Sequence, residues 1–250
     1  MAPPKKTRID LLLVKRDLAD SREKAQALIR AGQLLVNDQK VVKCGALVAG
    51  DAAVRLLGEP PKYVSRGGVK LEGALDHFRI DPDGKICLDV GASTGGFTDC
   101  LLQRGAARVL AVDAGTNQLD WKLRRDPRVV VFEKTNARYL TIAELGTHFD
   151  LITMDVSFIS STLILPVIPP LLEPEAEVLI LVKPQFEVGK GQVGNGGIVR
   201  DPRLHEGAVA RVSRALLALG FRDLASSESA LPGAEGNREF FLHALWRESG

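Results

Sequence analysis

Four ionisable residues, two lysines and two carboxylates, stand at the ends of apolar runs or ahead of them. Asp155 and Lys183 each close such a run, Glu239 directly precedes another, and Lys70 lies ahead of them all. A lysine held beside carboxylates can accept a proton or stabilise a developing oxyanion. The plainer alternative is that these residues form structural ion pairs. If the runs are parallel strands, Asp155 and Lys183 meet at one edge of the sheet.

A glycine-rich turn follows the apolar run at residues 86–90, and it consists of Gly91, Ala92, Ser93, Thr94, Gly95, Gly96 and Phe97. Glycine has no Cβ, so such a turn can bring the backbone close to a nucleotide-like ligand. Asp113 closes the next run, where a carboxylate can accept hydrogen bonds from ribose hydroxyls. Ser93 stands where the dinucleotide fingerprint has glycine. The turn therefore favours S-adenosyl-L-methionine over a nicotinamide cofactor.

The elements that must position these residues alternate from residue 85 onward. Continuous apolar runs of strand length occur at residues 86–90, 109–112, 129–132, 151–154, 178–182 and 240–245. Helical patterns lie between several of them, at residues 97–104 and 203–219 among others. Runs of this kind fit strands buried on both faces of a parallel sheet. The sequence predicts an α/β fold with a doubly wound, mostly parallel sheet.

The first part of the chain has a different character. Residues 1–60 contain eleven Lys or Arg and seven Asp or Glu, whereas the whole chain has a formal net charge of +2. Two helical patterns precede short β-like runs there, which predicts a small α+β domain over residues 1–59. Pro60 and Pro61 indicate a stiff linker over residues 60–64, with the second domain over residues 65–250.

Three strings of the first domain, Arg8–Val14, Ser21–Ala25 and Ile29–Asn37, resemble the ribosomal-protein S4-like RNA-binding domain, or alpha-L motif. In that family, basic helix residues face structured RNA. Phosphate contacts are expected from Arg8, Lys15, Arg22, Lys24, Arg30 and Lys43. The alternative is a small, solvated helical hairpin without an RNA partner.

Four further strings, Ser65–Gly67, Asp89–Thr98, Asp155–Ser160 and Lys183–Gly191, resemble the TlyA-type, hemolysin A-like family of ribosomal RNA 2′-O-methyltransferases. The likeness runs from about residue 7 to residue 246. It implies a Rossmann-like, FtsJ-like methyltransferase sheet, S-adenosyl-L-methionine as cofactor, and cytidine in ribosomal RNA or ribosomal subunits as substrate.

The family's catalytic Lys-Asp-Lys-Glu tetrad maps onto Lys70, Asp155, Lys183 and Glu239. Asp155 is also expected to contact the cofactor. Asn136 is expected to bind the adenine, although FtsJ-like relatives often have an aspartate there. Arg66 and Lys190 complete the expected RNA contacts.

A ribose 2′-hydroxyl must lose its proton as it attacks the methyl group. Lys183 either accepts that proton or remains cationic and stabilises the alkoxide, and the sequence does not separate the two. Residues 187–201 contain five glycines and predict a mobile flap over the crevice, or else a plain surface loop.

Three other functions compete with methyl transfer: a catalytically inactive RNA- or ribosome-binding protein, a membrane-lytic hemolysin and a dehydrogenase. The three cysteines and four histidines show no ligand spacing, so no metal is expected. The most apolar stretch, residues 163–182, is interrupted by four prolines and three glutamates, which argues against a membrane span. A cytoplasmic monomer is expected.

Overall fold

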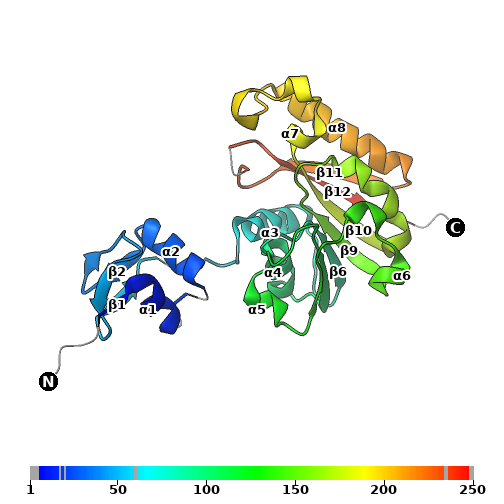
Figure 1. Cartoon of the computed structure of the whole chain (residues 1–250). Coiled ribbons are helices and arrows are strands. Elements are labelled where there is room, and N and C mark those ends of the chain that lie inside the picture. Colours follow the sequence, from blue (N-terminus) through cyan, green and yellow to red (C-terminus); the bar gives the residue numbers. More distant parts are fainter. Residues whose placement is uncertain (1–5, 17, 20, 59–60, 234–235, 248–250) are drawn as a thin grey trace. The chain divides into compact units, whose positions relative to one another are not determined.

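The computed structural model describes residues 6–16, 18–19, 21–58, 61–233 and 236–247 (Figure 1). Its chain forms two compact units, Met1–Pro61 and Lys62–Gly250. We describe each unit by itself.

The first unit combines two helices with short strands, in the order β1 (Lys6–Arg8), α1 (Ile9–Lys15), α2 (Arg22–Arg30), β2 (Leu34–Val36), β3 (Gln39–Lys40), β4 (Leu47–Ala49) and β5 (Val54–Leu56). Strand β2 pairs with both β3 and β5, and β1 pairs with β4, always antiparallel. Ser21 begins α2, because its side chain accepts a hydrogen bond from the Lys24 backbone N–H. Apolar residues of both helices and of β2 form one core, which includes Ile9, Leu13, Ala25, Ile29 and Leu34.

In the described part of the second unit, seven strands form one sheet in the order β11-β12-β10-β9-β6-β7-β8. Their bounds are β6 (Ile86–Val90), β7 (Arg108–Val112), β8 (Val129–Phe132), β9 (Phe149–Met154), β10 (Leu172–Val182), β11 (Arg222–Glu228) and β12 (Phe240–Leu245). Strands β8, β7, β6, β9 and β10 pair parallel, and β12 pairs antiparallel with both β10 and β11. The predicted mostly parallel α/β sheet is confirmed.

Helices cover both faces of this sheet: α3 (Arg66–Phe78), α4 (Gly96–Gln103), α5 (Trp121–Arg124), α6 (Ile142–Leu145), α7 (Pro184–Glu187) and α8 (Pro202–Ala218), with 3₁₀ turns at Ala137–Tyr139, Ser161–Leu163, Leu165–Val167, Pro169–Leu171, Lys190–Gln192 and Asn195–Gly197. Alternate strand residues supply two cores, because neighbouring side chains of a strand point to opposite faces. One core packs on α3, α4 and α5, and the other packs on α8 and the 3₁₀ turns after β9. This is a doubly wound sheet.

Several elements of the second unit differ from the sequence expectation, among them α3, β11 and β10. Helix α3, which carries Lys70, was not predicted, and neither was β11, whose residues are mostly exposed. Strand β10 begins six residues earlier than the apolar run predicted, at Leu172, and it contains Pro174. Its register against β9 shifts between Leu172 and Glu177, which is where a proline can be accommodated.

Candidate active site

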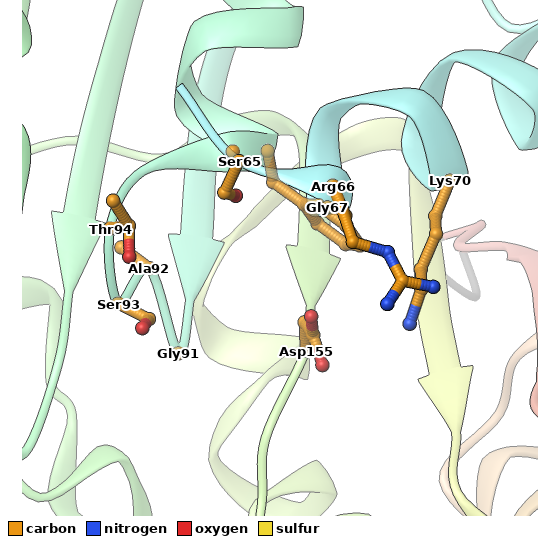
Figure 2. Close-up of a pocket in the computed structure, with 11 residues that line it drawn as sticks. Ser65, Arg66, Gly67, Lys70, Gly91, Ala92, Ser93, Thr94 and Asp155 are labelled. Atoms are coloured by element: carbon orange, nitrogen blue, oxygen red, sulfur yellow. The ribbon is translucent and has the colours of Figure 1, made fainter. Parts of the chain in front are cut away.

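The glycine-rich turn lies at the carboxyl end of β6, an interior strand of the sheet that pairs with β9 on one side and β7 on the other. Gly91 has φ +86°, and a Cβ on it would lie 2.3 Å from the backbone oxygen of Asp155. Only glycine allows this approach, so Gly91 lets the ends of β6 and β9 lie side by side. Asp155 is thereby brought next to the turn (Figure 2).

The packing of neighbouring side chains explains why residues 95 and 96 are glycine, whereas the sequence suggested close approach of a ligand. A Cβ on Gly95 would collide with the side chains of Leu119 and Leu123, and one on Gly96 would lie 2.2 Å from Ser65 Oγ. Both glycines therefore allow α4 to pack against neighbouring protein. Close approach of a ligand is not needed to explain them.

The carboxylate of Asp113, after β7, is held by the backbone. It accepts hydrogen bonds from the N–H of Ser93 at 2.8 Å and from the N–H of Gly115 at 2.7 Å. A carboxylate has about four lone-pair positions, so two remain for ribose hydroxyls. Asp113 and Asn136 line one pocket, and the Asn136 side chain accepts a hydrogen bond from the backbone N–H of Arg138.

The four residues of the predicted tetrad form two ion pairs. Lys183 Nζ lies 2.5 Å from Asp155 Oδ1, and Lys70 Nζ lies 2.5 Å from Glu239 Oε2. Asp155, Lys183 and Glu239 lie at the same edge of the sheet. Asp155 and Lys183 follow the carboxyl ends of β9 and β10, and Glu239 precedes the antiparallel β12, whose first residue Phe240 pairs with Val182 of β10. The Lys70–Glu239 pair is the more deeply buried, with side-chain exposures of 10% and 3%.

Three pockets adjoin these pairs. The first pocket has a volume of about 490 Å³ and is lined by the start of α3, the glycine-rich turn, Lys70 and Asp155 (Figure 2). The second, of about 670 Å³, is lined by Asp113, Asn136, Asp155 and apolar residues after β9. The third, of about 320 Å³, is lined by Lys183 and Glu239 among others. Each ion pair thus joins one residue of the first pocket to one residue of the third.

Phe158 was missed by the sequence reasoning. Its side chain is 92% exposed, its φ is +65°, and it lines both the second and the third pocket. Its ring centroid lies 5.2 Å from that of Phe186. A positive φ is uncommon for a bulky residue, and such strain is concentrated at functional sites. No sequence pattern signals this conformation.

The loop that carries Phe158 is fastened by a buried carboxylate. Glu187, at the end of α7, accepts hydrogen bonds from the hydroxyls of Ser160 and Ser161 and from the Ser161 N–H, at 2.5, 2.7 and 2.8 Å. The predicted flap, residues 187–201, is likewise tied down at its far end: Asn237 binds the Val199 N–H and the Gly197 carbonyl.

Asp89, on β6, is another acidic residue that the sequence reasoning did not select. Its side chain is fully buried and accepts hydrogen bonds from the hydroxyls of Thr98 at 2.7 Å and Thr153 at 3.3 Å. Burial raises the pKa of Asp89 to about 7, and the negative charge of Asp155 contributes to the rise. An unprotonated Asp89 is therefore costly to hold in the fold.

The residues expected to bind RNA fall into two groups. Arg8 and Arg22 both bind Asp10, whose carboxylate is fully buried and also accepts a hydrogen bond from Gln26. The hydrogen bond from Arg8 is the main reason why the pKa of Asp10 is far below its usual range. These two arginines therefore stabilise the first unit, whatever else they contact.

The remaining cations have varied surroundings. Lys15, Arg30 and Lys43 are exposed, and Lys24 is half-buried on α2. Arg66 lines the first pocket and donates a hydrogen bond to the Pro232 carbonyl at 3.0 Å. The side chain of Lys190 lies outside the part that the structure describes.

Two features are absent from the described residues. None of their helices is long and apolar enough to cross a membrane. No cluster of three or more His, Cys, Asp or Glu side chains among them is arranged to hold a metal ion.

In the described part of the second unit, the strand order, the one antiparallel strand β12 and the glycine-rich turn after the interior strand β6 define a Rossmann-like methyltransferase domain. Comparison with known families agrees. Residues 63–245 match the FtsJ-like methyltransferase family, and residues 7–44 match the S4 domain.

Individual relatives narrow the assignment. The chain is 48% identical to the 16S/23S rRNA (cytidine-2′-O)-methyltransferase TlyA of Mycobacterium tuberculosis, over 95% of this chain and 89% of the relative. It is 41% identical to Hemolysin A of Brachyspira hyodysenteriae, over 95% of this chain and 99% of the relative. A solved structure described as a "putative hemolysin" from Streptococcus thermophilus aligns with a TM-score of 0.76 at 42% identity, covering 100% of this chain and 90% of that one. The chain belongs to the FtsJ-like methyltransferase family, in the TlyA-type group with an S4 domain, as its sequence motifs indicated.

Proposed function

We propose that this protein transfers a methyl group from S-adenosyl-L-methionine to a ribose 2′-hydroxyl of cytidine in ribosomal RNA. The observation that carries the proposal is the pair of ion pairs, Asp155–Lys183 and Lys70–Glu239, each of which joins the first pocket to the third. A reaction between two substrates needs such a boundary, with acid–base groups on it. The TlyA relative is named as an rRNA (cytidine-2′-O)-methyltransferase, an activity of this kind.

The first and second pockets fit S-adenosyl-L-methionine. Both include Gly91, Ser93 and Asp155, so they form adjoining parts of one elongated site. The remaining lone pairs of Asp113 suit the ribose hydroxyls, and Asn136 suits the adenine edge. The backbone of the turn suits the methionine end, because N–H groups at the start of α4 attract a carboxylate. When bound, this cofactor supplies an electrophilic methyl group on a sulfonium sulfur.

The third pocket suits the acceptor nucleoside. Phe158 and Phe186 provide apolar ring surface on which a base can stack, a contact worth about 1–3 kcal/mol per base. Lys183 lies in the same pocket and addresses the 2′-oxygen. As that oxygen would form its bond to the methyl carbon and the carbon–sulfur bond would break, with its electrons leaving on sulfur, Lys183 receives the hydroxyl proton or stabilises the negative charge on the oxygen. Asp155 holds the Lys183 amine in place, and Glu239 does the same for Lys70.

The first unit supports an RNA substrate, because it matches the S4 domain and carries exposed cations at Lys15, Arg30 and Lys43. In this proposal the substrate is structured RNA or a ribosomal subunit, read through its shape and phosphates. The protein acts as a monomer in the cytoplasm, where ribosomes are found.

A single substitution tests the proposal. Lys183→Ala is expected to lower methylation of ribosomal RNA at least about 100-fold, as loss of an acid–base group commonly does. The measurement is incorporation of labelled methyl groups, with the product identified as 2′-O-methylated by its resistance to alkaline cleavage. Unchanged circular dichroism and thermal unfolding would show that the variant folds.

The matched control is Lys85→Ala, which removes a lysine that also pairs with a carboxylate, Glu177, at 2.8 Å, but does not line the three pockets. It is expected to methylate like the wild type. Methylation by Lys183→Ala at the wild-type rate would rule out the proposed role of the tetrad. If the wild type binds RNA without methylating it, the protein is a catalytically inactive RNA-binding protein and the proposal is wrong.

A further inference from the structure

The amine of Lys183 has a second partner besides Asp155. Its Nζ donates a hydrogen bond to Ser157 Oγ at 2.9 Å. The lysine side chain is only 12% exposed, so its position depends on these contacts more than on solvent. Ser157 comes two residues after Asp155 and lines both the second and the third pocket. It therefore stands where the cofactor and acceptor sites of the proposed function meet.

The ion pair and the hydrogen bond together restrict how the amine of Lys183 is turned. A tetrahedral amine has three positions besides its bond to Cε. Ser157 accepts a hydrogen bond at one of them. Asp155 Oδ1, 2.5 Å away, is an ion-pair partner that makes no hydrogen bond to the amine. Among the described residues no further hydrogen bond or ion pair involves this nitrogen, and since Lys183 lines the third pocket, a free position of the amine is available to an acceptor placed there. In a neutral amine one free position is a lone pair, and in an ammonium group each is an N–H.

One contact alone would not achieve this. With the Asp155 ion pair alone, the Nζ group could rotate about its bond to Cε, and its free positions would sweep through a range of directions. A fixed hydrogen-bond acceptor, Ser157, restricts that rotation. Ser157 is itself restrained, because the strained Phe158 follows it and Glu187 binds Ser160 and Ser161 further along the loop.

We propose that Ser157 is a positioning residue for methyl transfer: its hydroxyl accepts a hydrogen bond from Lys183 and, together with the ion pair to Asp155, turns a free position of the amine toward the ribose 2′-oxygen. The inference rests on the proposed function, and it holds whether Lys183 accepts the proton or stabilises the alkoxide. Ser157 acts through Lys183 and needs no contact with the reacting atoms.

The kinetic test uses the full-length protein with S-adenosyl-L-methionine and isolated ribosomal RNA or subunits. Ser157→Ala is expected to lower kcat about 10- to 100-fold, the usual effect of slight misplacement, with KM for both substrates within about twofold of the wild type. Ser157→Thr keeps a hydroxyl and is expected to restore most of the rate. A rise in KM with unchanged kcat, or a Thr variant as slow as the Ala variant, would overturn the inference.

A double mutant separates positioning of Lys183 from a general structural effect. Lys183→Ala combined with Ser157→Ala is expected to be no slower than Lys183→Ala alone, because residues that act as a unit are not additive. A further loss in the double mutant would show that Ser157 acts independently of Lys183, which contradicts the proposal. Thermal unfolding of each variant checks that the fold is kept.

A chemical readout keeps the inference testable without any methylation. Limited acetylation by acetic anhydride, followed by peptide mass spectrometry, compares Lys183 with Lys85 in the same sample. Loss of the serine acceptor frees the amine to turn toward the reagent, so Ser157→Ala is expected to raise the relative labelling of Lys183 about fivefold, and Ser157→Thr to leave it unchanged. Identical labelling in all three proteins would refute the Lys183–Ser157 contact. If the wild type labels as expected but does not methylate RNA, the proposed function fails while the contact stands.

Discussion

At the scale of single residues, the site depends on groups that are held in unfavourable states. Asp89 is a carboxyl group with no exposure to water, and Phe158 is a nearly fully exposed phenylalanine with a positive φ. Both lie next to the predicted tetrad in sequence or in space, since Asp89 feels the charge of Asp155 and Phe158 lines the pocket of Lys183. Local strain of this kind is characteristic of functional sites.

Asp89 gives the folded protein a specific pH dependence. Its pKa is raised from 3.8 to about 7, so over that interval the folded protein binds a proton that the unfolded chain releases. The stability that this proton contributes is fully present below pH 3.8 and is lost as the pH rises through 7. Each unit of separation between the two pKa values corresponds to about 1.4 kcal/mol.

Asp89→Asn is therefore expected to remove this part of the dependence. Between pH 5 and 8 the wild type should lose stability relative to the variant, and the measurement is urea unfolding of both proteins at several pH values. Parallel curves for the two proteins would show that Asp89 titrates normally.

At the scale of elements, the strands followed from the sequence because continuous apolar runs are a strong local signal. Helix α3 could not be predicted from the sequence, because Gly67, Gly68 and Gly73 lower its helix propensity. Gly68 is explained only by the tertiary fold, in which a Cβ would overlap the Tyr63 ring. The polar edge strand β11 gave no apolar run to detect.

The candidate site was predictable in its residue types and not in its pairing. Lys70 and Glu239 are 169 positions apart, and only the antiparallel β12 brings Glu239 to the edge where Lys183 lies. Ser157, Phe158 and Glu187 depend on the conformation of one loop, for which the sequence carries no periodic signal.

Two glycines provide a matched test of how the elements fit. Gly91→Ala places a Cβ at positive φ and 2.3 Å from the backbone of Asp155, so it is expected to destabilise the protein by more than about 1 kcal/mol and to lower activity by shifting Asp155. Gly207, in the middle of α8, has open space around it. Gly207→Ala is expected to stabilise the protein by up to about 1 kcal/mol. Urea unfolding measures both, and equal effects of the two substitutions would contradict this account.

At the scale of the whole molecule, two compact units divide the work in the proposed function. The second carries the pockets and the tetrad, and the first carries exposed cations around a core of its own. Phosphate contacts from the first unit add affinity for RNA that depends on salt, without touching the cofactor.

Arg30→Ala and Lys43→Ala are expected to weaken RNA binding and to reduce the slope of log K against log salt by about one for each phosphate that is no longer neutralised. Binding measured at four or more salt concentrations gives this slope, and binding of S-adenosyl-L-methionine should not change. Arg8→Ala should behave differently, because it also deprives the buried Asp10 of a partner and so lowers the thermal stability of the protein. An unchanged salt slope in Arg30→Ala and Lys43→Ala would show that neither residue binds the RNA backbone.

The antiparallel pairing of β12 with β10 also has a consequence for biosynthesis. Ribosomes make a chain from its N-terminus, and the partner of Lys70 is Glu239, which directly precedes β12, the last strand in sequence among the described residues. When only residues 1–238 have emerged from the exit tunnel, the nascent chain already contains the glycine-rich turn, Asp155 and Lys183. It still lacks the Lys70–Glu239 ion pair and the strand β12. The predicted tetrad is therefore completed only after Glu239 and β12 have been made, and a chain terminated before residue 239 is expected to be inactive even if it retains the cofactor pockets.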